Sequence, residues 1–304
     1  MTTRPSRSLR WSSGSGPVGL VLIGILSVQI GAAIAKGLFG EISPTAMVWL
    51  RLVTSALVLA AVARPRFTGR SRHDWLVVLG FGASLATMNW AIYQSFSRIP
   101  LGIAVTIEFI GPLTLAVIGS RHVRDLVWVL LAGLGVALLG FQPADLDVLG
   151  VGYALLAGAA WAAYILLSAS TGRRWAGFDG LAVASMIAAA GMTLPALLSA
   201  GSGLWDGRIL LIGALVGMLS SVIPYSCELV ALRSLRPAVF GILMSLEPAA
   251  AALTAIVVLH EHLSVLQWLA IACVVAASIG ATRSGATPGE KPGEHEHAPG
   301  TLAT

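Results

Sequence analysis

The chain has 304 residues, of which 56% are hydrophobic and 11% are charged, against roughly 25% charged residues in ordinary soluble domains. The mean hydropathy is +0.84 and the formal net charge is +5. This composition excludes an ordinary soluble domain and indicates a polytopic all-α protein in a lipid bilayer. The positive charge is explained by membrane topology and does not indicate a nucleic-acid partner.

Ten apolar segments follow one another along the chain, and each approaches the ~20 residues that a spanning helix needs. They cover 18–39, 45–63, 75–97, 102–120, 126–141, 149–171, 178–200, 209–232, 237–259 and 265–282. The start also resembles a secretory signal, with "AAIA" at 32–35, but the apolar run continues to Phe39, which favours a retained helix. Residues 1–17 form a short N-terminal segment, and the Gly- and Pro-rich tail 283–304 is expected to be disordered.

The basic residues predict the orientation. If the N-terminus is cytoplasmic, fifteen of the nineteen Lys and Arg residues fall in inner segments, and only Arg98 and Arg208 fall in outer loops. Both termini are therefore predicted to be cytoplasmic, in a multi-pass protein with an even number of helices.

A weak internal repeat divides the chain into 18–141 and 149–282. A shift of 139 residues places Gly102 on Gly241 and Glu108 on Glu247, so that an acid lies in the fourth helix of each half. Five is an odd number, so the second half must cross the membrane in the opposite direction, as in the inverted repeats of many secondary transporters. Chance similarity between apolar stretches is the alternative explanation.

Two stretches, "IPLGIAVTIEFIGPL" (99–113) and "IPYSCELVALRSLRPAVFGILMSLEPA" (223–249), resemble the EamA family of the drug/metabolite transporter superfamily. The similarity extends over about 18–282 and is greatest to the threonine/homoserine exporter branch. It implies a ten-helix carrier of a bacterial-type inner membrane, built from two inverted five-helix repeats, that exports small amino acids by proton antiport. It implies no cofactor, and a monomer or a homodimer would suffice.

The intramembrane acids are the first candidates for the site, because a charge at the bilayer centre costs roughly 2.5–3.5 kcal/mol on insertion scales. Glu108 and Glu247 could exchange a proton or hold a substrate's ammonium group, or else make structural hydrogen bonds. Each has a proline nearby, Pro112 and Pro248, which favours an interrupted helix facing a cavity.

Further polar residues could line the same cavity or serve packing. Tyr225 and Glu228 share a helical face after an expected kink at Pro224, and Glu228 could instead support the cytoplasmic end. Asn89 and Tyr93 form one stripe, and Tyr164 lies in another with Trp161 and Ser168. Arg51 could bind a substrate carboxylate, snorkel to the headgroups or pair with Glu41; Lys36, also near an outer end, has the same alternatives of substrate site and snorkelling.

Three other functions are alternatives to amino-acid export. The first is a related exporter of other metabolites, amino-acid analogues or drugs. The second is an intramembrane enzyme, which is disfavoured because no nucleophile–base pair, paired aspartates or metal-ligand cluster is visible in a span. The third is an ion channel, for which no filter is visible. The "HEH" at 260–262 lacks the spacing of a zinc site, so no metal is expected.

Overall fold

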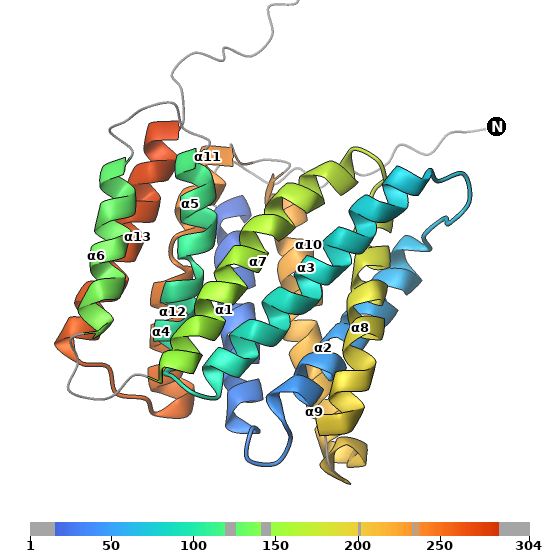
Figure 1. Cartoon of the computed structure of the whole chain (residues 1–304), viewed down its shortest axis with the longest axis horizontal. Helices are drawn as coiled ribbons and strands as arrows, with labels where there is room; N and C mark the ends of the chain where they lie inside the picture. The colour runs from blue at the N-terminus through green and yellow to red at the C-terminus, as the bar shows by residue number, and fades with distance from the viewer. Residues whose placement is uncertain are drawn as a thin grey trace, which may run out of the picture.

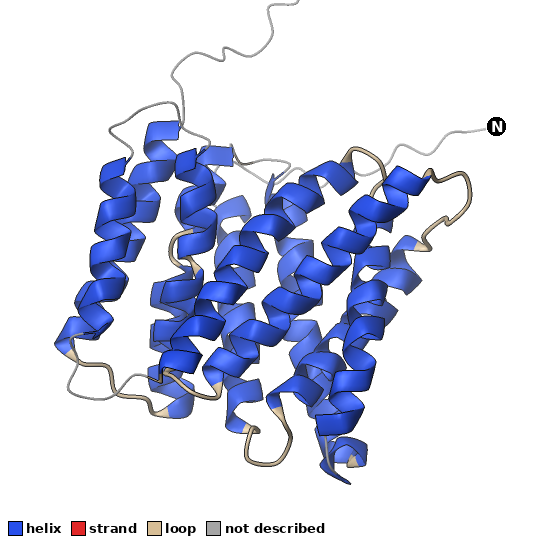
Figure 2. Cartoon of the chain, viewed as in Figure 1, coloured by secondary structure: helices blue, strands red, loops and turns tan. Residues whose placement is uncertain are grey.

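The computed structural model describes residues 16–118, 126–140, 147–199, 202–232, 235 and 237–285, and every regular element in these ranges is a helix (Figure 2). The first half contains α1 (Gly16–Gly37), α2 (Pro44–Ala63), α3 (Arg72–Phe96), α4 (Leu101–Glu108), α5 (Ile110–Ile118) and α6 (Leu126–Gly140). The second half contains α7 (Val148–Gly172), α8 (Asp179–Ser199), η2 (Ser202–Trp205), α9 (Gly207–Gly217), η3 (Met218–Val222), α10 (Ile223–Leu232), α11 (Pro237–Met244), α12 (Glu247–Leu259) and α13 (Val265–Gly285).

Eight helical stretches in the described ranges are long and apolar enough to cross a membrane. They are Gly16–Gly37, Pro44–Ala63, Arg72–Phe96, Val148–Gly172, Asp179–Ser199, Gly207–Glu228, Val239–Leu259 and Val265–Arg283. The expected fourth and fifth spans correspond to shorter apolar helices, Leu101–Leu115 and Leu126–Gly135. The protein is therefore a multi-pass membrane protein. Residues 1–15 of the predicted segment 1–17 and most of the tail lie outside the described residues, and α1 already includes Gly16 and Pro17.

Helices are interrupted beside both acids, as the prolines predict. The fourth segment breaks between α4, which ends at Glu108, and α5, which begins at Ile110. The ninth breaks between α11 and α12, and α12 begins at Glu247 with Pro248 in its first turn. A third irregularity, the π-helical turn η3, directly precedes α10 and Pro224. Interrupted helices leave backbone groups that need partners, which is tolerated in a membrane only where the backbone is buried or lines a cavity.

The helices form one bundle, with α6 beside α13 at one edge and α2 beside α8 toward the other, while α3 and α7 pack against each other between them (Figure 1). Small residues permit the closest approaches. A Cβ added at Gly111 would overlap the backbone of Gly158, and one at Gly82 would lie 2.9 Å from the carbonyl oxygen of Ala184. These contacts bring α5 against α7 and α3 against α8.

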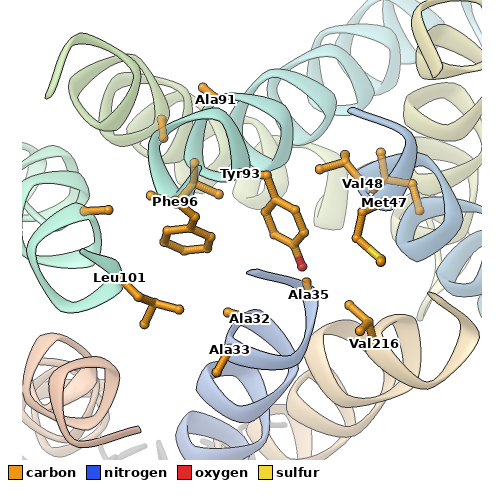
Figure 3. Close-up of a cluster of buried hydrophobic side chains, with 14 of the residues drawn as sticks. Ala32, Ala33, Ala35, Met47, Val48, Ala91, Tyr93, Phe96, Leu101 and Val216 are labelled. Carbon is orange, nitrogen blue, oxygen red and sulfur yellow. The ribbon is translucent and has the colours of Figure 1, made fainter. Parts of the chain in front are cut away.

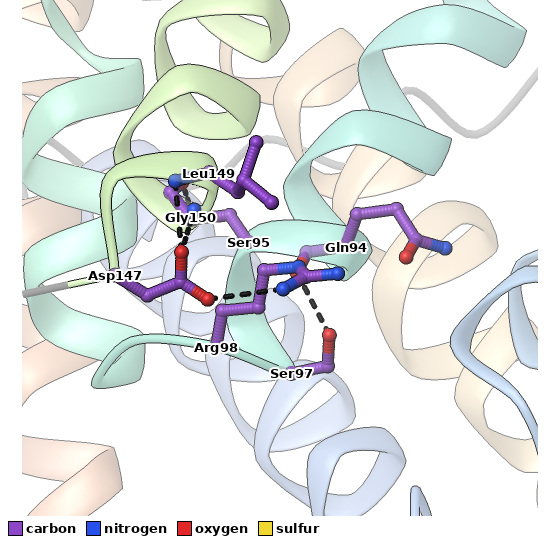
Figure 4. A network of polar contacts seen from close by, with 7 residues as sticks. All are labelled: Gln94, Ser95, Ser97, Arg98, Asp147, Leu149 and Gly150. Atoms are coloured by element: carbon purple, nitrogen blue, oxygen red, sulfur yellow. Dashed lines mark hydrogen bonds and ion pairs between the residues drawn. The ribbon is translucent and has the colours of Figure 1, made fainter.

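A polar network joins the end of α3 to the start of α7 (Figure 4). Ser95 Oγ donates a hydrogen bond to the Gly150 carbonyl oxygen at 2.8 Å, and Arg98 Nη1 lies 3.0 Å from Asp147 Oδ2. Asp147 also caps α7, because its Oδ1 accepts hydrogen bonds from the backbone N–H groups of Leu149 and Gly150. The network fixes these two central helices relative to each other at one end.

Candidate functional site

A cavity of about 550 Å³ lies inside the bundle, and its wall is mostly apolar. Such cavities bind small molecules through a few placed polar groups. The polar and aromatic lining residues with hydrogen-bonding groups are Gln29, Arg51, Asn89, Glu108, Trp161, Tyr164, Ser168, Ser220, Tyr225, Glu228, Glu247, Ser278 and Thr282. They come from both halves of the chain.

Glu108 and Glu247 lie at the same end of a helix pair. The start of α4 lies near the end of α12, because Leu101 N donates a hydrogen bond to Glu261 Oε2 at 3.0 Å, and Gly102 packs on Ala252. The two helices therefore run antiparallel, which brings the last residue of α4, Glu108, and the first of α12, Glu247, to the same depth. Both are buried, and in the described part of the chain neither carboxylate has an ion-pair partner within 4.0 Å.

Arg51 is a buried cation held by the π-helical turn. Its Nη2 donates to the carbonyl oxygen of Ser220 at 2.8 Å, and its Nε donates to Ser221 Oγ at 3.3 Å. The guanidinium carbon lies 5.6 Å from the centre of the Tyr93 ring. The expected alternative, a pair with Glu41, is not formed, because Glu41 binds Arg208 at 2.6 Å. No described acid lies within ion-pair distance of Arg51, so the cavity contains a cation and acids that are not paired with one another.

Comparison with known proteins gives concordant results. The model of the EamA-like transporter family matches residues 148–283. The threonine/homoserine exporter RhtA of Salmonella typhimurium (strain LT2) is 40% identical over 272 residues, which cover 88% of this chain and 91% of that protein. Its Escherichia coli K12 counterpart is 39% identical over 269 residues, with the same coverage.

This chain belongs to the EamA-like transporter family. The resemblance found in the sequence is confirmed, and the relatives are transporters and not enzymes. A crystal structure of a protein that is 19% identical shares the fold, with a TM-score of 0.59 over 88% of this chain and 96% of that chain.

Most of the polar residues singled out in the sequence lie together in this EamA-like transporter. Seven of the nine candidates line the cavity: Arg51, Asn89, Glu108, Tyr164, Tyr225, Glu228 and Glu247. Asn89 Nδ2 is used within its own helix, since it donates to the Leu85 carbonyl oxygen at 2.8 Å, which leaves the amide oxygen for other partners. The stripe on α3 thus faces the cavity through Asn89. The stripe on α7 faces it through Trp161, Tyr164 and Ser168.

Tyr93 and Lys36 are placed differently. Tyr93 is fully buried in an apolar cluster outside the cavity wall, and its hydroxyl points toward Ala35 (Figure 3). It touches the site only indirectly, by lying beneath Arg51. Lys36 lies at the end of α1, where its Nζ is 2.7 Å from Glu261 Oε1, and it is not among the lining residues.

Four polar lining residues carry no prediction from the sequence: Gln29, Ser220, Ser278 and Thr282. Gln29 is a lone amide within the apolar run of α1, and Ser220 lies in η3 beside the Arg51 guanidinium. Gln29 could have been identified from the sequence, because an amide inside an apolar membrane helix needs a hydrogen-bond partner, as a buried acid does. Ser220 could not be singled out, since only the π-helical turn distinguishes it from other small polar residues.

Proposed function

We propose that this transporter is a secondary carrier that exports small zwitterionic amino acids, with threonine and homoserine as its first candidate substrates, across a bacterial inner membrane. The observation that supports this most directly is the unpaired charge in the cavity. Arg51 offers a planar guanidinium with donors to spare, and Glu108, Glu228 and Glu247 offer carboxylates. An amino acid carries the two complementary groups, a carboxylate for Arg51 and an ammonium for the acids. The names of the relatives point to the same substrates.

The transport cycle is proposed to use ten spans arranged as two inverted repeats, 18–141 and 149–282, with both termini in the cytoplasm. The matching interruptions beside Glu108 and Glu247 support this arrangement, because each falls in the fourth helical segment of its half. The cavity lies between residues of both halves, where rocking of one repeat against the other would expose it alternately to each side. One chain supplies the whole cavity, so a monomer suffices and a homodimer is compatible.

Proton coupling is proposed to run through the acids. A carboxylate that must be neutral in one step and charged in another links substrate release to proton uptake, and Glu108 and Glu247 are placed together for such an exchange. The driving force for export is then the inward proton gradient.

Lys36 is proposed to act outside the substrate site. Its Nζ also donates to the Ile99 carbonyl oxygen at 2.8 Å, and Glu261 reaches the start of α4. The Lys36–Glu261 pair therefore links the end of α1, the loop after α12 and the start of α4 at one end of the bundle.

The test is flux into proteoliposomes with labelled threonine, with and without a pH gradient, for wild type and Arg51→Lys. Lysine keeps the charge but lacks the two-donor fork, so we expect KM for threonine to rise about tenfold while threonine-dependent flux persists. Arg208→Lys, at an exposed arginine that pairs with Glu41, is the matched control and should behave as wild type. An absence of threonine-dependent flux in the wild-type protein under both conditions would refute the proposal.

The volume of the cavity favours a second candidate, export of larger metabolites, amino-acid analogues or drugs. About 550 Å³ lies within the range of roughly 300–1,000 Å³ that binds drug-sized ligands. A competition panel against labelled threonine separates the two. If larger analogues compete better than threonine, the second candidate is favoured.

A further inference from the structure

Within the described part of the chain, the buried amide of Gln29 has no hydrogen-bond partner. Gln29 is 2% exposed and lines the cavity, and its Oε1 has no partner among the residues that the structure describes. None of the described hydrogen bonds uses its Nε2 either. A buried polar group left unsatisfied is costly, so an unpaired amide in a membrane helix that lines a cavity marks a place where a ligand completes the hydrogen bonding.

Gln29 faces the part of the cavity between α1 and α12. It lies seven residues before Lys36, so the two side chains share one face of α1. That face meets the α12 side, because Lys36 binds Glu261 and Gly37 packs against Leu259. Ser27 and Gly31 lie on the other side, where they contact Leu219 and Ser220 of η3. Gln29 is therefore separated from the turn that holds Arg51.

The free amide has a specific chemical complement. A carboxylate can accept from the nitrogen but gives nothing to the oxygen, and an ammonium group can donate to the oxygen but accepts nothing from the nitrogen. A hydroxyl both donates and accepts, so it satisfies both ends of the amide, whichever way the amide is turned. The charged ends of a zwitterion already have Arg51 and the acids as partners.

We propose that Gln29 is a specificity-determining residue that binds the side-chain hydroxyl of the transported amino acid. This proposal rests on the proposed function and narrows its substrate class to hydroxyl-bearing amino acids. It explains how the carrier would reject valine, which has the shape of threonine with a methyl group in place of the hydroxyl. When valine occupies the cavity, the Gln29 amide stays unpaired, and sites of this kind discriminate strongly against the analogue that lacks the hydroxyl.

The experiment compares kcat/KM for labelled threonine and labelled valine in proteoliposomes. We expect wild type to prefer threonine by about tenfold or more, and Gln29→Leu to bring the ratio close to one, mainly by losing threonine transport. Gln94→Leu is the matched control, because Gln94 does not line the cavity and its Nε2 already donates to Thr45 Oγ1 at 2.9 Å. Its ratio should equal that of wild type.

The experiment distinguishes failure of the Gln29 hydroxyl site from failure of the proposed function. If wild type transports neither amino acid, the proposed function fails. If wild type transports both equally, or if Gln29→Leu keeps the wild-type ratio, the hydroxyl site is refuted while amino-acid export stands. If Gln29→Leu does not transport either amino acid, the rise in melting temperature of the purified variant on addition of threonine or of valine is compared instead. Equal stabilisation by threonine and valine supports the proposal, and a retained threonine advantage overturns it.

Discussion

Lys36 and Glu261 form an ion pair at 2.7 Å that joins the end of α1 to the loop after α12. Each partner also binds backbone, since Lys36 donates to Ile99 O and Glu261 accepts from Leu101 N. The connection between α3 and α4 is thereby held between segments that are distant in the sequence. Both side chains are mostly buried, at 19% and 16% exposure, so water weakens the pair less than it weakens an exposed pair.

The pair predicts energetic coupling between its two residues. Lys36→Met and Glu261→Gln should each lower the melting temperature in detergent, and the double variant should lose less stability than the two single losses added together, with a coupling of about 1 kcal/mol. The control is Arg208→Met with Glu41→Gln, because that pair is exposed and should show weaker coupling. Strictly additive effects at Lys36 and Glu261 would contradict the prediction.

Replacing either of the two central acids, Glu108 or Glu247, should reduce proton-coupled transport. Glu108→Gln and Glu247→Gln each remove a charge while keeping the shape of the side chain, and a hydrogen bond to a charged group contributes about 1.5–3 kcal/mol, or about 10–100-fold in affinity. We expect gradient-driven export of threonine to fall at least tenfold in each variant. Labelled efflux from energised vesicles measures this, with the exposed Glu41→Gln as the unaffected control. Wild-type export in both acid variants would exclude them from the mechanism.

A single methyl group at Gly158 should destabilise the fold. A Cβ there would lie 2.5 Å from the carbonyl oxygen of Glu108, at the break between α4 and α5, so Gly158→Ala forces a shift of backbone. Overpacking of this kind costs about 1–3 kcal/mol. Gly152→Ala on the same helix is the matched control, because nothing lies within 4 Å of a Cβ at that position. Thermal unfolding in detergent compares the two, and equal melting temperatures would argue against this close packing.

The ionised Asp147 carboxylate at the start of α7 should make the stability of the folded protein depend on pH. The hydrogen bond from Arg98 is the main reason that the pKa of Asp147 lies below its ordinary value of 3.8, and the backbone N–H groups of Leu149 and Gly150 add to the effect. A lowered pKa means that the interaction stabilises the fold above about pH 4 and is lost as the pH falls through the lowered value. In the Asp147→Asn variant, the melting temperature should therefore fall less than in wild type as the pH is lowered.

The control for Asp147 is Asp206→Asn. Asp206 caps α9 through backbone N–H bonds at 2.7 and 3.4 Å, much as Asp147 does at 2.8 and 3.4 Å, but it forms no ion pair in the described structure. Melting temperatures measured from pH 3 to pH 7 would show a flatter curve for Asp147→Asn than for Asp206→Asn. Identical curves would mean that the Arg98 pair contributes nothing.

The sequence by itself determined the class of protein and most of the cavity. Apolar runs near the thickness of a bilayer can satisfy their backbone only as helices, so the positions of the helices followed from composition. Acids and polar side chains inside those runs are costly unless they face a polar space, and seven of the nine candidates do line one cavity. The interruptions at Glu108 and Glu247 were also predictable, because proline removes a backbone donor.

The tertiary structure alone decided which polar residues are already partnered. Lys36 and Arg51 are both single cations near helix ends in the sequence, yet Lys36 binds Glu261 while Arg51 has no described acid within reach and faces the cavity. Tyr93 and Asn89 lie one turn apart, yet only Asn89 lines the wall. Pairing depends on contacts between segments more than a hundred residues apart, and a helical period fixes only the face of a residue and not what lies opposite it.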